Sequence, residues 1–106
     1  MIKIQQGESY PIYITLTQDG VVLTPDLVVD LKVCIGDALS KTYSAGDVKF
    51  DEEMEKWYIW PTQQETIALS EDSYSVQCHV KYQDGSLLIV TVGRIHISES
   101  CCGEVF

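Results

Sequence analysis

The segment from Asp72 to Ile97 constrains the fold of this chain more than any other. Within it, apolar or aromatic side chains alternate with polar ones, and the apolar set is Tyr74, Val76, Cys78, Val80 and Tyr82. A period of two is typical of a β-strand with one buried face. Asp84-Gly85 then predicts a tight turn into a second β-rich segment, residues 87–97. The segment therefore predicts a β-hairpin and an antiparallel β architecture.

Length and charge limit the class of protein. A chain of 106 residues is one domain, and it is long enough to bury a core without disulfide support. Its net charge of −9 repels phosphate backbones and anionic lipids, so neither nucleic acid nor a membrane is an expected partner. No apolar segment reaches the ~18 residues that span a bilayer, and the first residues lack the apolar core of a signal peptide. We therefore expect the protein to be made and kept in the cytosol of the cell that produces it.

Other segments repeat the β pattern. Asp19-Gly20 predicts a second tight turn, and Val29, Leu31, Val33 and Ile35 form an inward-facing set. Residues 48–51 and 56–60 read as another hairpin around an acidic loop. Counting back from that loop gives two inward-facing pairs, Phe50 with Trp57 and Val48 with Ile59. A slip of one residue would instead bury Tyr58 and Trp60.

One short helical turn interrupts the strands. Thr62-x-x-Glu65 matches a capping box, which predicts a helical turn over residues 62–68. Asp72-Ser73-Tyr74 follows, and a tyrosine at that place often bonds back across the sheet corner. Seven to eight short strands predict an all-β, antiparallel, immunoglobulin-like β-sandwich over residues 1–98, with residues 99–106 as a tail. A small barrel is the alternative.

The four cysteines are expected to be free thiols. Cys78 falls on the buried face of its strand, whereas Cys34 has the opposite parity to its apolar neighbours and faces outward. A bridge between two facing sheets needs both side chains inside. Without secretion, reduced thiols are the default. Cys101-Cys102 has no matching second pair, so a zinc site is not expected there.

Catalysis is not expected. The predicted turn places His79 opposite Val90 and His96 opposite Ser73, roughly 20 Å apart at the rise of a strand, so the two histidines cannot share a metal. Ser73 beside His96 resembles a nucleophile and its base, but nothing marks an orienting acid or an oxyanion hole. We therefore expect an exposed polar pair, with no catalytic residue, no cofactor and no metal.

The acidic loop and a pair of aromatic residues each have a possible binding role and a simpler structural explanation. The acidic residues of the loop 51–55 offer oxygen ligands for calcium, but they lack the alternating spacing and the mid-loop glycine of known calcium loops. A solvated hairpin tip is the simpler interpretation. Tyr58 and Trp60, on an outer face, form a possible sugar-stacking surface, although such aromatics more often cover the core or an edge.

The most informative feature is an apolar stripe on the last strand. The predicted turn places Val80 opposite Ile89 and leaves Leu88, Val90 and Val92 facing outward. A soluble monomer normally avoids three successive outward apolar positions, so the stripe is a candidate protein-interaction surface. Two alternatives remain open. A bulge near Gly93 would shift the register and split the inner set, and the N-terminal strand or the tail would otherwise cover the stripe.

Several short motifs also resemble a known family. They are Gln6–Ile12, Leu16–Gly20, Val33–Gly36, Tyr74–Gln77 and Asp84-Gly85. In this order they look like small prophage structural proteins and are similar to the N-terminal domain of phage baseplate upper proteins. The resemblance covers about residues 1–98, and it implies an immunoglobulin-like sandwich that docks to other virion proteins. The long C-terminal portion that carries receptor recognition in that family has no counterpart here, and no catalytic residue is implied.

Together these patterns predict a non-enzymatic structural or interaction module. The expected setting is a phage or prophage virion, in the baseplate or tail, with other virion proteins or further copies of the chain as partners. The chain would pass through the host cytoplasm during assembly. The alternative is a carbohydrate-binding β-sandwich that presents Tyr58 and Trp60.

Overall fold

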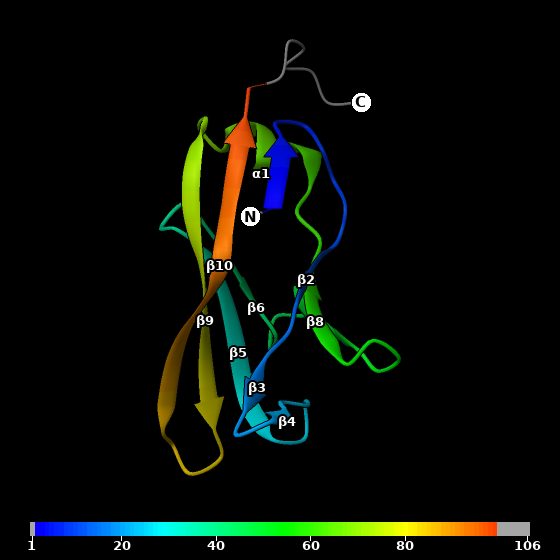
Figure 1. Ribbon diagram of the computed structural model, residues 1–106, viewed down its shortest axis with the longest axis vertical. Helices are drawn as coiled ribbons and strands as arrows, with labels where there is room; N and C mark the ends of the chain where they lie inside the picture. Colours follow the sequence, from blue (N-terminus) through cyan, green and yellow to red (C-terminus); the bar gives the residue numbers. More distant parts are fainter. Residues whose placement is uncertain (1, 100–106) are drawn as a thin grey trace.

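The computed structural model describes residues 2–99, which form ten β-strands and one short helix (Figure 1). The prediction of an all-β chain with one helical turn is confirmed, with more strands than the predicted seven to eight. The elements are β1 Ile2–Gln5, β2 Ile12–Ile14, β3 Thr17–Gln18, β4 Val21–Val22, β5 Val28–Ile35, β6 Leu39–Thr42, β7 Val48–Asp51, β8 Lys56–Ile59, α1 Gln63–Ala68, β9 Asp72–Tyr82 and β10 Leu87–Ser98. Of the predicted tail, all but Glu99 lies outside the described residues.

The larger sheet has five strands in the order β1-β10-β9-β5-β6. Its inner pairs are antiparallel, including the predicted hairpin of β9 and β10. β1, however, runs parallel to β10, from Ile2 opposite Ile95 to Gln5 opposite Ser98. The prediction of a wholly antiparallel architecture is therefore wrong at this edge. The first and last described strands lie side by side (Figure 1).

The smaller sheet has three strands in the order β2-β8-β7, and β3 and β4 form a separate hairpin. The predicted register of β7 and β8 is confirmed, since Val48 lies opposite Ile59 and Phe50 opposite Trp57. The β3–β4 turn has positive φ at both Asp19 (54°) and Gly20 (79°), as a two-residue hairpin turn requires.

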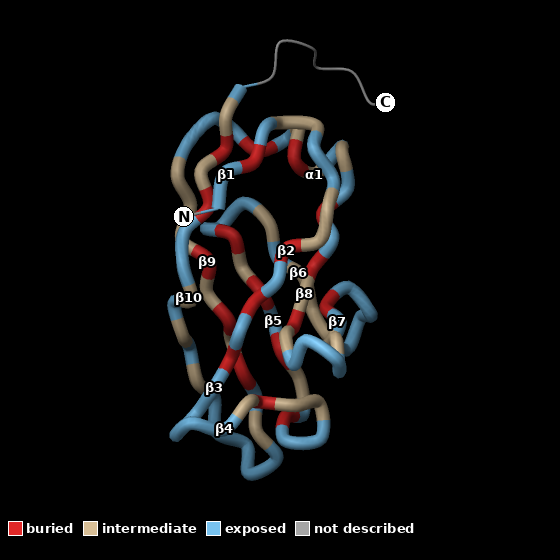
Figure 2. The backbone as a smooth tube through the Cα atoms, turned by 45° about the vertical axis from the view of Figure 1, so that its right-hand side comes forward, coloured by how far each residue is buried: buried red, intermediate tan, exposed pale blue. Residues whose placement is uncertain are grey.

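Apolar residues of both sheets form one core, seen as the buried positions in Figure 2. Trp57 of β8 is fully buried at its centre, with its ring edge-on to Tyr43 and Phe50. Its indole N–H donates to the carbonyl of Leu23 at 2.8 Å, so the one polar atom of this side chain is satisfied. The inward faces predicted for β9 and for most of β5 are confirmed.

One position of β5 departs from the predicted alternation. Val28 is buried and Val29 is exposed, because the register with β9 shifts between Val28 and Asp30. The prediction that Val29 faces the core is therefore wrong, whereas Leu31, Val33 and Ile35 are buried as predicted. A local irregularity of this kind reverses the face of every residue on one side of it.

Helix α1 closes one end of the molecule. The capping box is confirmed, since the Thr62 side chain accepts from the Glu65 N–H and the Glu65 carboxylate accepts from the Thr62 N–H. Partial burial opposes ionisation of Glu65, but hydrogen bonds from Lys41 and Thr62 outweigh it and lower the pKa of the carboxyl. The Tyr74 hydroxyl donates to the Ser70 carbonyl at 2.9 Å, the expected bond across the corner. Within residues 2–99, no helix has the length and apolar character needed to cross a bilayer.

Candidate interaction surface

The β9–β10 hairpin has a different turn from the one that its sequence predicts. The Tyr82 N–H donates to the Ser86 carbonyl at 3.0 Å, so the loop contains three residues, Gln83 to Gly85. The Asp84 carboxylate accepts from both the N–H and the hydroxyl of Ser86, which stabilises the longer loop. Within this loop, only Gly85 has a positive φ (89°). A three-residue loop moves β10 by one position relative to a two-residue turn.

This shift corrects the predicted stripe. Leu88 lies opposite Val80 and Val90 opposite Cys78, two fully buried partners, so the stripe residues point toward the core. Leu88 and Val92 are half-buried and pack against it. The prediction that Leu88, Val90 and Val92 face outward is therefore wrong. For the same reason His79 lies opposite Ile89, and not opposite Val90.

A bulge in β10 then restores the predicted register. Thr91 lies opposite Gln77 and Gly93 opposite Val76, which leaves Val92 as the extra residue. Beyond the bulge Ile95 and Ile97 are buried, as predicted. This is the split inner set that a bulge near Gly93 was expected to produce. β10 therefore has an upper half, Ile95–Ser98, and a lower half, Leu87–Thr91, of opposite parity.

The exposed apolar side chains of β10 are those of the odd positions in its lower half. Leu87 is 72% exposed and Ile89 is 59% exposed, and both point away from the core. The exposed apolar stripe therefore exists on this strand, but its residues differ from the predicted ones. Sequence parity alone did not identify Leu87 and Ile89 as exposed. The sequence signal that identifies them is Ser86, because its hydrogen bonds to Asp84 stabilise the three-residue loop that shifts the register.

The same segment is an unpaired edge of the larger sheet. β1 contacts β10 only from Ile95 to Ser98, and among residues 2–99 no strand pairs with the other side of Leu87–Thr91. Figures 1 and 2 both show this lower half at the margin of the molecule. The sequence from Leu87 to Val92 contains no charged residue and no proline. Such residues usually protect an edge strand against pairing with another chain.

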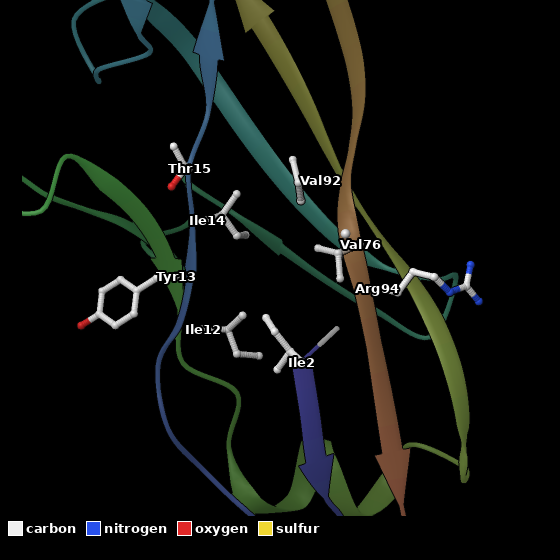
Figure 3. Close-up of a pocket in the computed structure, with 9 residues that line it drawn as sticks. Ile2, Ile12, Tyr13, Ile14, Thr15, Val76, Val92 and Arg94 are labelled. Atoms are coloured by element: carbon white, nitrogen blue, oxygen red, sulfur yellow. The ribbon is translucent and has the colours of Figure 1, made fainter.

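A cleft of about 300 Å³ lies beside the bulge, between the edges of the two sheets. Figure 3 shows Ile12 and Ile14 of β2 facing Val76 and Val92 across it, with Tyr13 and Arg94 directed away from its floor. β1, which pairs with the upper half of β10, closes one end of the cleft, where Ile2 lines it. The two sheets are therefore incompletely closed against each other along the flank that contains the free part of β10.

The aromatic surface on the smaller sheet is where the sequence placed it. Trp60 is 57% exposed and Tyr58 is half-buried, and both line a hollow of about 330 Å³ together with Lys49. The ring of Tyr13, which the sequence did not single out, lies 5.4 Å from that of Tyr58 at 46°. Two rings tilted in this way present no common flat face to a sugar.

Two other candidate groups, the Ser73–His96 pair and the acidic loop, form local hydrogen bonds. The Ser73 hydroxyl lies 3.0 Å from Nδ1 of His96, as the predicted pairing requires. In the acidic loop, Asp51 accepts from the Met54 N–H at 3.0 Å and so shapes the turn. Within the part of the chain that the structure describes, no three His, Cys, Asp or Glu side chains are grouped so that they could hold a metal ion.

Cys34 and Cys78 are free thiols, as predicted. Cys78 is fully buried between β5 and β10, whereas Cys34 lies on the other face and is half-exposed. Burial, together with the neighbouring Cys34, raises the pKa of the Cys78 thiol to about 12, so this group is inert at neutral pH. Cys101 and Cys102 lie outside the described residues.

Comparisons with known protein families, with curated proteins and with solved structures found no match for this chain.

Proposed function

We propose that this chain is a non-enzymatic structural or interaction module with an immunoglobulin-like sandwich fold. One observation carries the proposal: the lower half of β10 combines an unpaired strand edge with the exposed side chains of Leu87 and Ile89. Unpaired main-chain groups supply affinity in strand addition, and neighbouring side chains supply specificity. An unprotected strand edge carries a risk of aggregation, so its presence here favours a binding role for this edge.

The proposed setting is a phage or prophage virion, in which the chain joins the baseplate or tail and docks to other virion proteins. Support for the setting comes from the resemblance of its short motifs to baseplate proteins. Support for the immunoglobulin-like fold comes from the two sheets with one core and from the Tyr74–Ser70 bond at the sheet corner. The chain would be made in the host cytoplasm and would then enter the particle.

Purified particles test this setting. Particles made by the genome that encodes the chain should contain it at a constant ratio to the capsid protein across a density gradient, measured by quantitative mass spectrometry. A variant with Ile89→Lys should fold but be depleted from them, whereas Val21→Lys, equally exposed on β4, should be incorporated normally. Particles that lack the wild-type chain would refute the virion role.

A second candidate function is carbohydrate binding at Tyr58 and Trp60. The observation that favours it is the hollow beside the exposed indole of Trp60, which a hydrogen bond to Ser9 at 3.2 Å holds in place. Aromatic faces stack on sugar rings, so a bound glycan should change the fluorescence of Trp60 while the buried Trp57 stays unaffected. A glycan array with the wild type and with Trp60→Ala decides this alternative, since binding that the variant retains would exclude the site.

A further inference from the structure

The main-chain groups that are free on the lower half of β10 follow from the hairpin. The Tyr82 N–H bonds to the Ser86 carbonyl, so residues 82 and 86 form a hydrogen-bonded pair. Hydrogen-bonded pairs alternate along an antiparallel ladder. Leu88 and Val90 therefore bond to Val80 and Cys78, while the N–H and C=O groups of Leu87, Ile89 and Thr91 point to the open edge.

From this arrangement we infer that two copies of the chain pair antiparallel along this edge, with the two-fold axis at Ile89. The inference rests on the proposed function, because it names the partner of the same surface. With the axis at Ile89, Leu87 of each copy lies opposite Thr91 of the other, and Ile89 lies opposite its own equivalent. All three residues with free main-chain groups then become hydrogen-bonded, whereas moving the axis by one residue either way leaves one of them without its equivalent partner.

Side chains also favour a second copy as the occupant. The segment Leu87–Val92 is uncharged, so the net charge of −9 is not concentrated where two copies would meet. The exposed Ile89 side chains would cover each other across the axis, and each exposed Leu87 would pack beside Thr91 of the other copy. At both ends of the contact, the turn of one copy, which contains the acidic Asp84, would lie near the cationic Arg94 of the other copy, and this arrangement gives charge complementarity.

The open length of the edge suits this arrangement. β1 begins at Ile2, opposite Ile95, and among residues 2–99 no strand pairs with the free side of β10 from Leu87 to Arg94. Because the bulge at Val92 adds one residue to β10, the β9–β10 turn of the second copy would reach the level of Arg94 and Ile95, where β1 begins. The two larger sheets would join into one continuous sheet across the axis, and the cleft beside Val92 would lie next to the new strand.

Sedimentation velocity over a concentration series from about 1 μM to about 1 mM tests the inference. The wild type should pass from monomer to dimer, and Ile89→Lys should weaken the dimer at least tenfold. Val21→Lys is the matched control, because Val21 is 58% exposed against 59% for Ile89 but lies on β4, so this variant should dimerise normally. A wild type that stays monomeric throughout, or a dimer that Ile89→Lys leaves unchanged, would overturn the pairing.

Cysteine cross-linking tests the register. Residues paired across the axis have Cα atoms about 5.5 Å apart, within the range of a disulfide. Ile89→Cys should therefore form a covalent dimer under mild oxidation, with an 89–89 bond identified by peptide mapping. Leu87→Cys, although more exposed, should form its own 87–87 bond at least tenfold more slowly. Faster bonding at residue 87 would refute the axis at Ile89.

These results separate the two proposals. A monomeric chain that is nevertheless found in purified particles would refute pairing between copies and leave the virion role standing, with another virion protein on the edge. A dimer with an 89–89 bond that is not found in particles would refute the virion role and leave the pairing standing.

Discussion

The two halves of β10 show how one strand can serve two purposes. In the upper half, Ile95 and Ile97 are buried and β1 covers the edge. In the lower half the parity is reversed, Leu87 and Ile89 are exposed, and the edge is open. A single extra residue, Val92, separates them. The difference teaches that the exposure of an apolar residue in a sheet depends on its register as much as on its own chemistry.

Matched lysine substitutions in the two halves should give the largest difference. Ile95→Lys places a charge in the closed core, so it should lower the free energy of unfolding by more than about 4 kcal/mol and abolish the folded state. Ile89→Lys places the same charge in solvent and should change the monomer's stability by less than about 1 kcal/mol. Urea unfolding at low protein concentration, followed by tryptophan fluorescence, measures both. Equal losses would contradict the assigned parity.

The lower half, although it is an edge, should still seal the core beneath it. Cys78 lies opposite Val90 on the neighbouring strand β9, and burial raises the pKa of its thiol to about 12. At pH 8 it should therefore react with a thiol reagent roughly a thousandfold more slowly than an exposed cysteine. Cys34 should react readily, and peptide mapping separates the individual cysteines. Rapid reaction at Cys78 would show that the lower half opens frequently.

The same thiol should make the protein sensitive to alkali. From its ordinary pKa of 9.0 up to about 12, the unfolded chain releases the Cys78 proton while the folded chain keeps it. Stability should therefore fall as the pH rises through this window, by up to about 1.4 kcal/mol per pH unit. Cys34→Ser should retain this slope, and Cys78→Val should reduce it. Chemical unfolding at several pH values tests the difference.

Deletion of Val92, the extra residue of the bulge, should preserve both halves of β10. Deletion of Val92 leaves every cross-strand pair of β10 in place, because Val92 is the residue without a partner. We expect the fold to persist and the free energy of unfolding to fall by about 1–2 kcal/mol, since the half-buried valine no longer packs against the core. Backbone NMR contacts between β9 and β10 would report any change of register, which would contradict the assigned bulge.

The smallest change in stability is expected at Gly93, the residue that follows Val92 at the bulge. A Cβ at Gly93 would meet nothing within 4 Å, and the φ of this residue is not in the left-handed region. Gly93→Ala should therefore stabilise the protein by about 0.4–1 kcal/mol, by restricting the unfolded chain. Gly36→Ala is the contrasting control, because its Cβ would lie 2.9 Å from Tyr74 and its φ is positive, so it should destabilise. Thermal unfolding compares the two variants, and destabilisation by Gly93→Ala would mean that the bulge needs glycine.

The two Asp-Gly turns show how far the sequence predicts this fold. Asp19-Gly20 forms the predicted two-residue turn, whereas Asp84-Gly85 lies in a three-residue loop, because Ser86 offers two donors to the Asp84 carboxylate. Alternation within one strand predicted β9 correctly, and counting back from the acidic loop predicted the β7–β8 register, since both patterns are local. The parallel pairing of β1 depends on contacts between the ends of the chain, which a local pattern does not contain.

The candidate surface was predicted in part for the same reason. The sequence identified the correct strand and anticipated a bulge near Gly93, but it selected Leu88, Val90 and Val92, where the structure exposes Leu87 and Ile89. The predicted register of β10 was wrong by one residue. Side chains of a strand alternate between two faces, so a shift of one residue exchanges the buried face with the exposed one. The outward position of Trp60 was predicted correctly, because the pairing of β7 with β8, which ends one residue before it, contains no irregularity.

The parallel pairing of β1 with β10 also determines how the domain would bear mechanical load. Ile2 and Ser98 lie at opposite ends of the paired segment, since Ile2 faces Ile95 and Gln5 faces Ser98. A tension applied between these two residues would slide one strand along the other and strain all their hydrogen bonds together. Antiparallel strands pulled from adjacent ends would instead peel apart one bond at a time. The domain would therefore resist a pull applied between Ile2 and Ser98 more strongly than a pull that separates antiparallel strands from one end.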